Sequence, residues 1–233
     1  AAEQGIGFYE DLDSLESNGV LETENSDISE RARLRGLRSL GTLGSGNHFL
    51  EIQSVERIVD TDTAKHWGIF EGQLLAMIHS GSRGLGHQVC SEHSRNLEHM
   101  YKRDGDKWYN ENWDYHIADR QLACAPFHSK EGQQYLADMN AAANFAFANR
   151  SALAHRLREV LSLEMGQDGE ARVLYDVAHN IAKVETHSIH GKNCQCTVHR
   201  KGATRAFGGD HLELNSLFKS TGQPVLVPGD MGT

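Results

Sequence analysis

The chain has 233 residues, a formal net charge of -9, 39% hydrophobic residues and 24% charged residues. This composition allows a folded core, excludes wholesale disorder, and includes no stretch that is long and apolar enough for a membrane span. A protein that grips nucleic acid over a broad surface is usually basic, so any such binding here must be local or assisted by metal.

The first half of the chain predicts short helices followed by strands. Short helices are expected around residues 12–21 and 31–35, within a polar N-terminal region. A glycine-rich turn at 41–46 leads into a strand near 47–52, and the apolar run 74–78 predicts a buried strand that ends at a loop.

The second half predicts a helical insertion between further strands. Few helix breakers occur over 84–103, and residues 131–165 have the apolar spacing of one long helix or two consecutive ones. Strands are expected over 172–178, 196–200 and 224–228. We therefore expect an α+β fold, with a β-rich core and a helical insertion, formed by a single domain.

Fourteen histidines are the most unusual feature of the composition, and three of them share a setting. His48, His79 and His179 each lie where an apolar run meets a polar or glycine-rich turn. Neutral imidazoles that converge from rigid strand ends can bind a divalent metal, whereas each one alone could equally be a half-buried, hydrogen-bonded histidine. Nitrogen ligands suit manganese, iron and zinc alike, so the residues leave the metal open.

Glycine-rich and basic segments are the next candidates for a binding site. The segments 41–46 and 228–233 would let backbone N–H groups approach an anion, but neither is a Walker motif and a plain turn explains each of them as well. Basic side chains occur at Arg83 and throughout 199–205, where they could bind phosphate or form a solvated surface turn.

The remaining cysteines and histidines predict no further site. Four cysteines are too few for a disulfide scaffold, and with no secretory signal in the first residues they indicate a cytoplasmic protein. Cys194 and Cys196 lack the spacing of a zinc knuckle and are expected to be ordinary strand residues. The histidines expected on the surface are His87, His93, His99, His116 and His128.

Five segments, taken in order, closely resemble the signature blocks of the RtcB family of RNA ligases. They are GTLGSGNHFLE (41–51), HSGSRGLG (79–86), DVAHN (176–180), HRKGATR (199–205) and PGDMGT (228–233). The resemblance runs from about residue 35 to the C-terminus, and the order of five blocks makes it specific. It implies an RtcB-like mixed fold and a single catalytic domain over residues 1–233, apparently truncated at both ends.

The resemblance also implies roles for individual residues. His48, His79 and His179 match the family's ligands of two manganese ions. The residues that match its segments for GTP, the other cofactor, are Asn47, His48, Phe49, Leu50, Glu51, His179, Asn180, Pro228, Gly229, Asp230 and Met231. The residues that match basic positions near nucleotide or RNA phosphate are Arg83, Lys201 and Arg205.

The implied activity is RNA ligation in tRNA splicing and RNA repair. In the family, a histidine attacks the α-phosphate of GTP and becomes guanylylated, and the GMP then passes to an RNA 3′-phosphate, which can derive from a 2′,3′-cyclic phosphate. The 5′-hydroxyl of the other RNA end finally displaces GMP. The expected partners are GTP, RNA with these ends such as tRNA halves, and the activator archease, without a membrane.

The chain departs from the family pattern at both ends. The family has an Asp-X2-Cys motif whose cysteine bridges the metals, but residues 1–40 contain no cysteine. The block with the nucleophilic histidine would follow Thr233, and a late lysine that contacts guanine is missing too. We therefore expect a central fragment of a ligase, with no catalytic nucleophile of its own. The alternatives are an inactive remnant that binds metal or nucleotide, and a metal-dependent phosphoesterase.

Overall fold

The computed structural model describes residues 3, 5–166 and 170–227. It confirms the mixed α+β fold, because helices alternate with antiparallel sheets along the chain. Within these residues, no helix combines the length and the apolarity that crossing a membrane requires.

The contacts divide the chain into two compact units, which we call unit 1 and unit 2. Unit 1 contains residues 1–20, 43–80 and 150–233, and unit 2 contains residues 21–42 and 81–149. The single domain expected over the whole chain stays a prediction.

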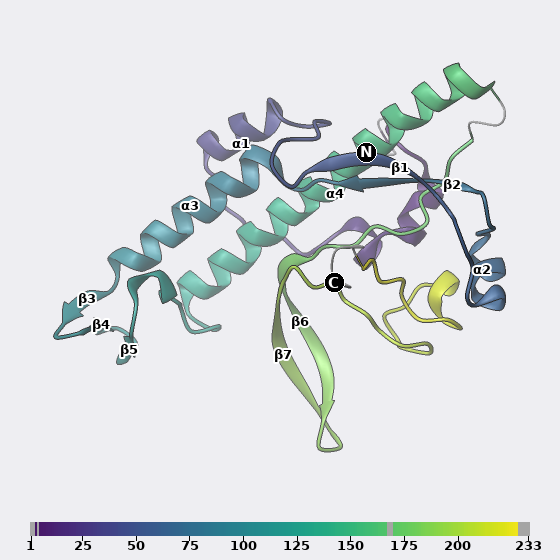
Figure 1. The fold of residues 1–233 in the computed structure, drawn as a ribbon. Helices are drawn as coiled ribbons and strands as arrows, with labels where there is room; N and C mark the ends of the chain where they lie inside the picture. Colours follow the sequence, from purple (N-terminus) through teal and green to yellow (C-terminus); the bar gives the residue numbers. More distant parts are fainter. Residues whose placement is uncertain (1–2, 4, 167–169, 228–233) are drawn as a thin grey trace. The chain divides into compact units, whose positions relative to one another are not determined.

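Unit 1 is built around two pairs of antiparallel strands (Figure 1). Strand β1 (Phe49–Ser54) pairs with β2 (Leu74–His79), and β6 (Asn180–Ile189) pairs with β7 (Lys192–Lys201). The other elements assigned wholly to unit 1 are η2 (Tyr9–Ser14), η3 (Glu16–Gly19), α2 (Thr61–Trp67) and η6 (Ser216–Phe218).

Unit 2 is mainly helical and carries a small sheet. Its elements are α1 (Glu30–Leu37), α3 (Arg83–His99), β3 (Lys102–Asp104), β4 (Lys107–Asn110), β5 (Tyr115–Ile117) and η4 (Arg120–Leu122). The three strands form an antiparallel sheet in the order β3-β4-β5. Helix α4 (Lys130–Met165) contributes residues to both units.

The apolar core of unit 2 is made by helices. Ala32 of α1, Leu85 and Val89 of α3, and Ala142 of α4 form one buried cluster. Gly36 of α1 permits the close approach of α1 and α3, since a Cβ atom there would lie 2.9 Å from Cδ1 of Leu85. Ser29 begins α1 by accepting a hydrogen bond from the Ala32 N–H, as an N-cap residue does.

The long hairpin of unit 1 follows directly from its turn residues. His190 and Gly191 connect β6 to β7, and both have a positive φ, of 50° and 77°. Two such residues form the tight turn whose twist matches that of paired strands. The register then pairs Asn180 with Lys201 at the open end of the hairpin.

Most of the predicted elements are confirmed. Helices occur near residues 12–21, 31–35 and 84–103, and one continuous helix covers 131–165. Strands occur near 47–52, 74–78 and 196–200. Most of the observed ends lie within two residues of the predicted ones. The strand over 74–78 is less buried than expected, because none of its residues is fully buried and its alternating side chains leave Leu74, at 57%, and Ala76 exposed.

Two predicted strands are wrong. Residues 172–178 form only an isolated parallel bridge between Leu15 and Asp176, because no strand ladder lies beside them. Residues 224–227 form no strand either, and Pro224 has no N–H to donate to a ladder. Residue 228 lies outside the described residues.

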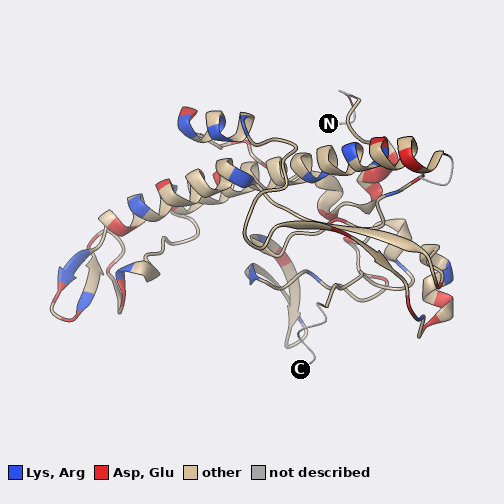
Figure 2. Ribbon diagram, turned by 45° about the horizontal axis from the view of Figure 1, so that its top comes forward, with Lys and Arg blue, Asp and Glu red and all other residues tan. Residues whose placement is uncertain are grey.

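Acidic and basic residues are mixed along the described helices and strands (Figure 2). The net charge of -9 nevertheless comes from one segment, because residues 1–30 contain nine Asp and Glu and no Lys or Arg, while acidic and basic residues balance over the rest of the chain. Cys194 and Cys196 are strand residues of β7, as predicted, and both are free thiols.

Candidate metal centre

The three predicted histidines come together in unit 1, and we call His48, His79 and His179 the histidine cluster. The Nε2 atoms of His79 and His179 lie 3.1 Å apart, at a ring-centroid distance of 5.0 Å. The ring of His48 lies 5.9 Å from that of His79, between centroids. Residues that are 131 positions apart in the sequence thus form one group.

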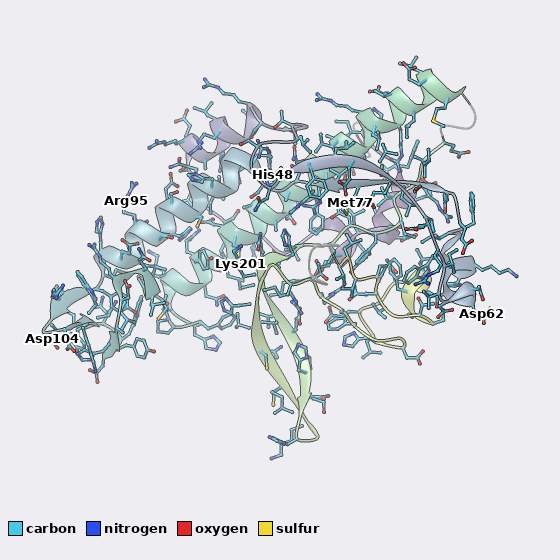
Figure 3. All side chains as sticks on the ribbon, in the orientation of Figure 1. His48, Asp62, Met77, Arg95, Asp104 and Lys201 are labelled. Atoms are coloured by element: carbon cyan, nitrogen blue, oxygen red, sulfur yellow. The ribbon has the colours of Figure 1, made fainter. Side chains whose placement is uncertain are left out.

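Strand pairing positions two of these histidines. His48 comes directly before β1, and His79 ends β2 opposite Phe49, whose ring packs edge-on against the His79 ring at 5.2 Å. His48 therefore lies next to His79 because β1 and β2 are antiparallel. Figure 3 labels His48 at the entry to β1.

The third histidine is held by the end of the β6–β7 hairpin. The Gly202 N–H donates to the His179 carbonyl at 2.7 Å and to Oδ1 of Asn180 at 3.1 Å. Gly202 has a φ of 74°, so the chain can turn sharply after β7 at this point. The backbone on the C-terminal side of His179 is thereby fixed.

The electrostatics favour neutral imidazole at His179. Burial lowers its pKa below the usual 6.5, and the nearby His79, Lys201 and Arg150 lower the pKa further. A neutral imidazole has a lone pair to give to a cation, whereas a protonated one has none. Two nitrogen ligands bound at about 2.1 Å to one ion lie roughly 3 Å apart, so the separation of His79 and His179 fits a shared divalent cation.

Within the described residues, His79 and His179 face one another as candidate ligands for such an ion, and His48 lies beside His79. Among residues 3, 5–166 and 170–227, no three or more His, Cys, Asp or Glu side chains are grouped tightly enough to hold a metal. Asp230, which the sequence placed in the nucleotide segment, lies outside this range, together with Pro228, Gly229 and Met231.

The predicted nucleotide segment around β1 is largely accessible. Asn47 and Glu51 are exposed, and His48, Phe49 and Leu50 are half-buried. Lys201 is exposed at the end of β7, opposite Asn180 in the register, and is labelled in Figure 3.

The other two predicted phosphate-binding residues, Arg205 and Arg83, form hydrogen bonds within the protein. Arg205 is only 3% exposed, and its Nη1 donates to Glu213 at 2.8 Å. The Arg205 charge is thus balanced inside unit 1, and its predicted contact with phosphate stays a prediction. Arg83 belongs to unit 2, where its Nε donates to Oγ1 of Thr42 at 3.4 Å.

One histidine that was expected on the surface is not there. His93 is half-buried, and its Nε2 lies 2.8 Å from Oδ2 of Asp138 on α4. The prediction was wrong because the sequence does not show that this face of α3 packs against an acidic partner. His87, His99, His116 and His128 are exposed, as predicted.

Sequence reasoning missed the residues that support the histidine cluster. Arg150 and Asp176 form a buried ion pair, and Glu16 accepts a hydrogen bond from the Ala178 N–H at 3.0 Å. Asp176 lies inside the DVAHN block but had no role assigned. The signal for Arg150 was its charge, the first after Asp138 in an alanine-rich stretch of helix.

Comparison with known proteins identifies the family of the chain. The family model described as tRNA-splicing ligase RtcB matches residues 1–233. The chain is 48% identical over 238 residues to the tRNA-splicing ligase RtcB of Pyrococcus furiosus, and 46% identical over 237 residues to that of Thermococcus kodakarensis. It is also 48% identical over 234 residues to the RNA-splicing ligase RtcB of Mycobacterium bovis.

The chain belongs to the RtcB family. All of it is matched in each of these three relatives, but it spans only 24%, 47% and 52% of their respective lengths.

Proposed function

We propose that the protein carrying this chain is a GTP- and manganese-dependent RNA ligase. It joins an RNA 3′-phosphate, or a 2′,3′-cyclic phosphate, to a 5′-hydroxyl end, and its substrates include tRNA halves. The names of the family and of the relatives support the class of reaction. The single observation that supports the metal dependence is the 3.1 Å approach of Nε2 of His79 to Nε2 of His179.

The residues of this chain have three roles in the proposal. His48, His79 and His179 hold divalent cations, which when bound neutralise crowded phosphates and acidify an attacking oxygen. Asn47 to Glu51 and Asn180 bind the guanine nucleotide, and Lys201 brings positive charge to phosphate at the end of β7. The proposal assigns no residue of this chain as the histidine that becomes guanylylated.

The test uses the intact gene product with Mn(II) and labelled GTP. We expect a covalent protein-guanylate and the sealing of RNA that carries 3′-phosphate and 5′-hydroxyl ends. His79→Ala and His179→Ala should each lower guanylylation by about 100-fold or more, because each removes a ligand. His99→Ala is the matched control, since His99 is exposed at the end of α3 and should leave the rate unchanged.

Two outcomes would overturn the proposal. If the intact protein forms no guanylate and seals no RNA, it is not a ligase, and Mn(II) binding without turnover would then identify an inactive remnant. If it hydrolyses a 2′,3′-cyclic phosphate without needing GTP, the histidine cluster serves a phosphoesterase.

A further inference from the structure

A largely buried ion pair links the segments that carry two of the cluster histidines. Nε of Arg150, on α4, donates to Oδ1 and Oδ2 of Asp176 at 2.7 and 2.9 Å, and its Nη2 lies 2.6 Å from Oδ1. The two side chains are only 13% and 11% exposed. A guanidinium that contacts both oxygens of a carboxylate fixes its orientation as well as its position.

The same guanidinium also contacts the segment of His79. Nη1 of Arg150 donates to the carbonyl of Ser80 at 3.2 Å, and Ser80 directly follows His79. Asp176 precedes His179 by three residues. One side chain therefore links the chain just after His79 to the chain just before His179.

The segment before His179 depends on such contacts because it is not part of a sheet. The one strand-like pairing of residues 172–178 is the bridge between Asp176 and Leu15, in which the Asp176 N–H donates to the Ser14 carbonyl and the Glu16 N–H donates to the Asp176 carbonyl. Regular strand pairing begins only at Asn180. The path of the chain into His179 is thus held by this bridge, by the Glu16 carboxylate at the Ala178 N–H and by Arg150 at the Asp176 carboxylate.

We propose that Arg150 and Asp176 are positioning residues that hold the imidazoles of His79 and His179 at the separation a shared divalent cation requires. The inference rests on the proposed function for the identity of that cation. Neither residue is expected to touch the cation, and both act through the backbone segments that bear its ligands. Residues of this kind tune metal affinity without binding the metal.

Unit 1 contains a matched ion pair that serves as a control. Arg158 lies eight residues further along α4, and its Nη1 and Nη2 donate to the two oxygens of Asp11 at 2.8 and 2.6 Å. Its exposure, 11% against 13% for Asp11, matches that of the first pair. Arg158 also contacts the carbonyl of Ala171, at 2.8 Å, which lies eight residues before His179 and outside the stretch from Asp176 to His179.

The experiment measures Mn(II) binding to the intact protein by titration calorimetry. Asp176→Asn keeps the size of the side chain but removes its charge, and it should weaken Mn(II) binding by about 10- to 100-fold. Asp11→Asn should leave the affinity within about twofold of the wild type, while the two variants lower the thermal midpoint of the metal-free protein to a similar extent.

A second pair of variants covers the case in which Asp176→Asn does not fold. Arg150→Lys keeps the charge but loses the planar fork, so it should weaken Mn(II) binding by a smaller factor, and Arg158→Lys is its control. Hydrogen exchange of the metal-free protein gives an independent readout. Amides of residues 176–180 should exchange faster in Arg150→Lys than in Arg158→Lys.

The outcomes separate this inference from the proposed function. Wild-type Mn(II) affinity in both Asp176→Asn and Arg150→Lys would overturn the positioning role and leave the ligase proposal intact. Equal losses in the Asp176 and Asp11 variants would also overturn it, because the effect would then be one of general stability. If the wild-type protein binds no Mn(II), the proposed function fails first.

Discussion

Asn149 is a buried polar side chain that forms hydrogen bonds with backbone groups of the loops at residues 41–42 and 81. It is fully buried on α4, and its Oδ1 accepts the N–H groups of Gly41 at 2.7 Å and Thr42 at 3.2 Å. Its Nδ2 donates to the carbonyls of Thr42 and Gly81, both at 3.2 Å. The start of the glycine-rich turn is therefore fixed by one amide.

Asn149→Ala should destabilise the protein by about 3 kcal/mol, because it leaves buried N–H and carbonyl groups without these hydrogen bonds. Chemical denaturation of the chain measures the change in the free energy of unfolding. Asn140→Ala, on the same helix, removes one solvent-exposed hydrogen bond to the Glu22 carbonyl and should cost only about 0.5–1 kcal/mol. Equal effects of the two substitutions would contradict this account.

The sequence identified the candidate metal ligands, but it did not identify the buried polar residues that hold the backbone around them. His48, His79 and His179 were recognisable by residue type and by their place at the ends of apolar runs. Arg150 and Asn149 were not, because an arginine and an asparagine in a helix usually face solvent. Their burial depends on which distant segments pack against that face of α4.

The β6–β7 hairpin is an element whose stability should depend on pH. Glu185 of β6 is buried, and its carboxylate accepts hydrogen bonds from Arg200 of β7 and from His187 at 2.9 Å. Burial by itself raises the pKa of the Glu185 carboxyl, but the hydrogen bonds from Arg200 and His187 outweigh it and hold this pKa below 4.5.

A carboxyl whose pKa is lower in the folded state stabilises that state above its unfolded pKa, near 4.5, and loses the effect as the pH falls through the folded pKa. Wild-type stability should therefore decline below about pH 4.5 by more than that of Glu185→Gln, which has no carboxyl to protonate here. Urea denaturation at a series of pH values measures both curves. Parallel curves would show that Glu185 does not contribute.

Elements with a strong local signal were predictable from the sequence. The apolar spacing of α4 and the glycine-rich turn before β1 depend on neighbours within a few residues. The segment 172–178 has the composition of a strand but lies beside no ladder, so its hydrogen bonds go to other groups. Composition favours an extended backbone, and only a neighbouring strand makes it part of a sheet.

At the scale of the whole molecule, helix α4 crosses the boundary between the two units without interruption. The boundary falls between Asn149 and Arg150, within the 36 residues of this helix. Breaking the helix there would expose the buried contacts that both residues make. We therefore expect the units to unfold together.

Scanning calorimetry of the 233-residue chain should show a single transition, with equal calorimetric and van't Hoff enthalpies. Two resolved peaks would contradict this and would also contradict the prediction of a single domain. Asn149→Ala is expected to lower the midpoint of the single transition without splitting it.

By itself the sequence determined the α+β class, most of the helices and strands, the family, and the three histidines. Each of these depends on residue type, on local spacing or on the order of short blocks, all of which are properties of the linear chain. The tertiary structure decided that the imidazoles of His79 and His179 face one another, and that Arg150 joins their segments. Contacts such as those between His79 and His179, 100 positions apart, and between Ser80 and Arg150, 70 positions apart, follow from how strands and helices pack, which no local pattern encodes.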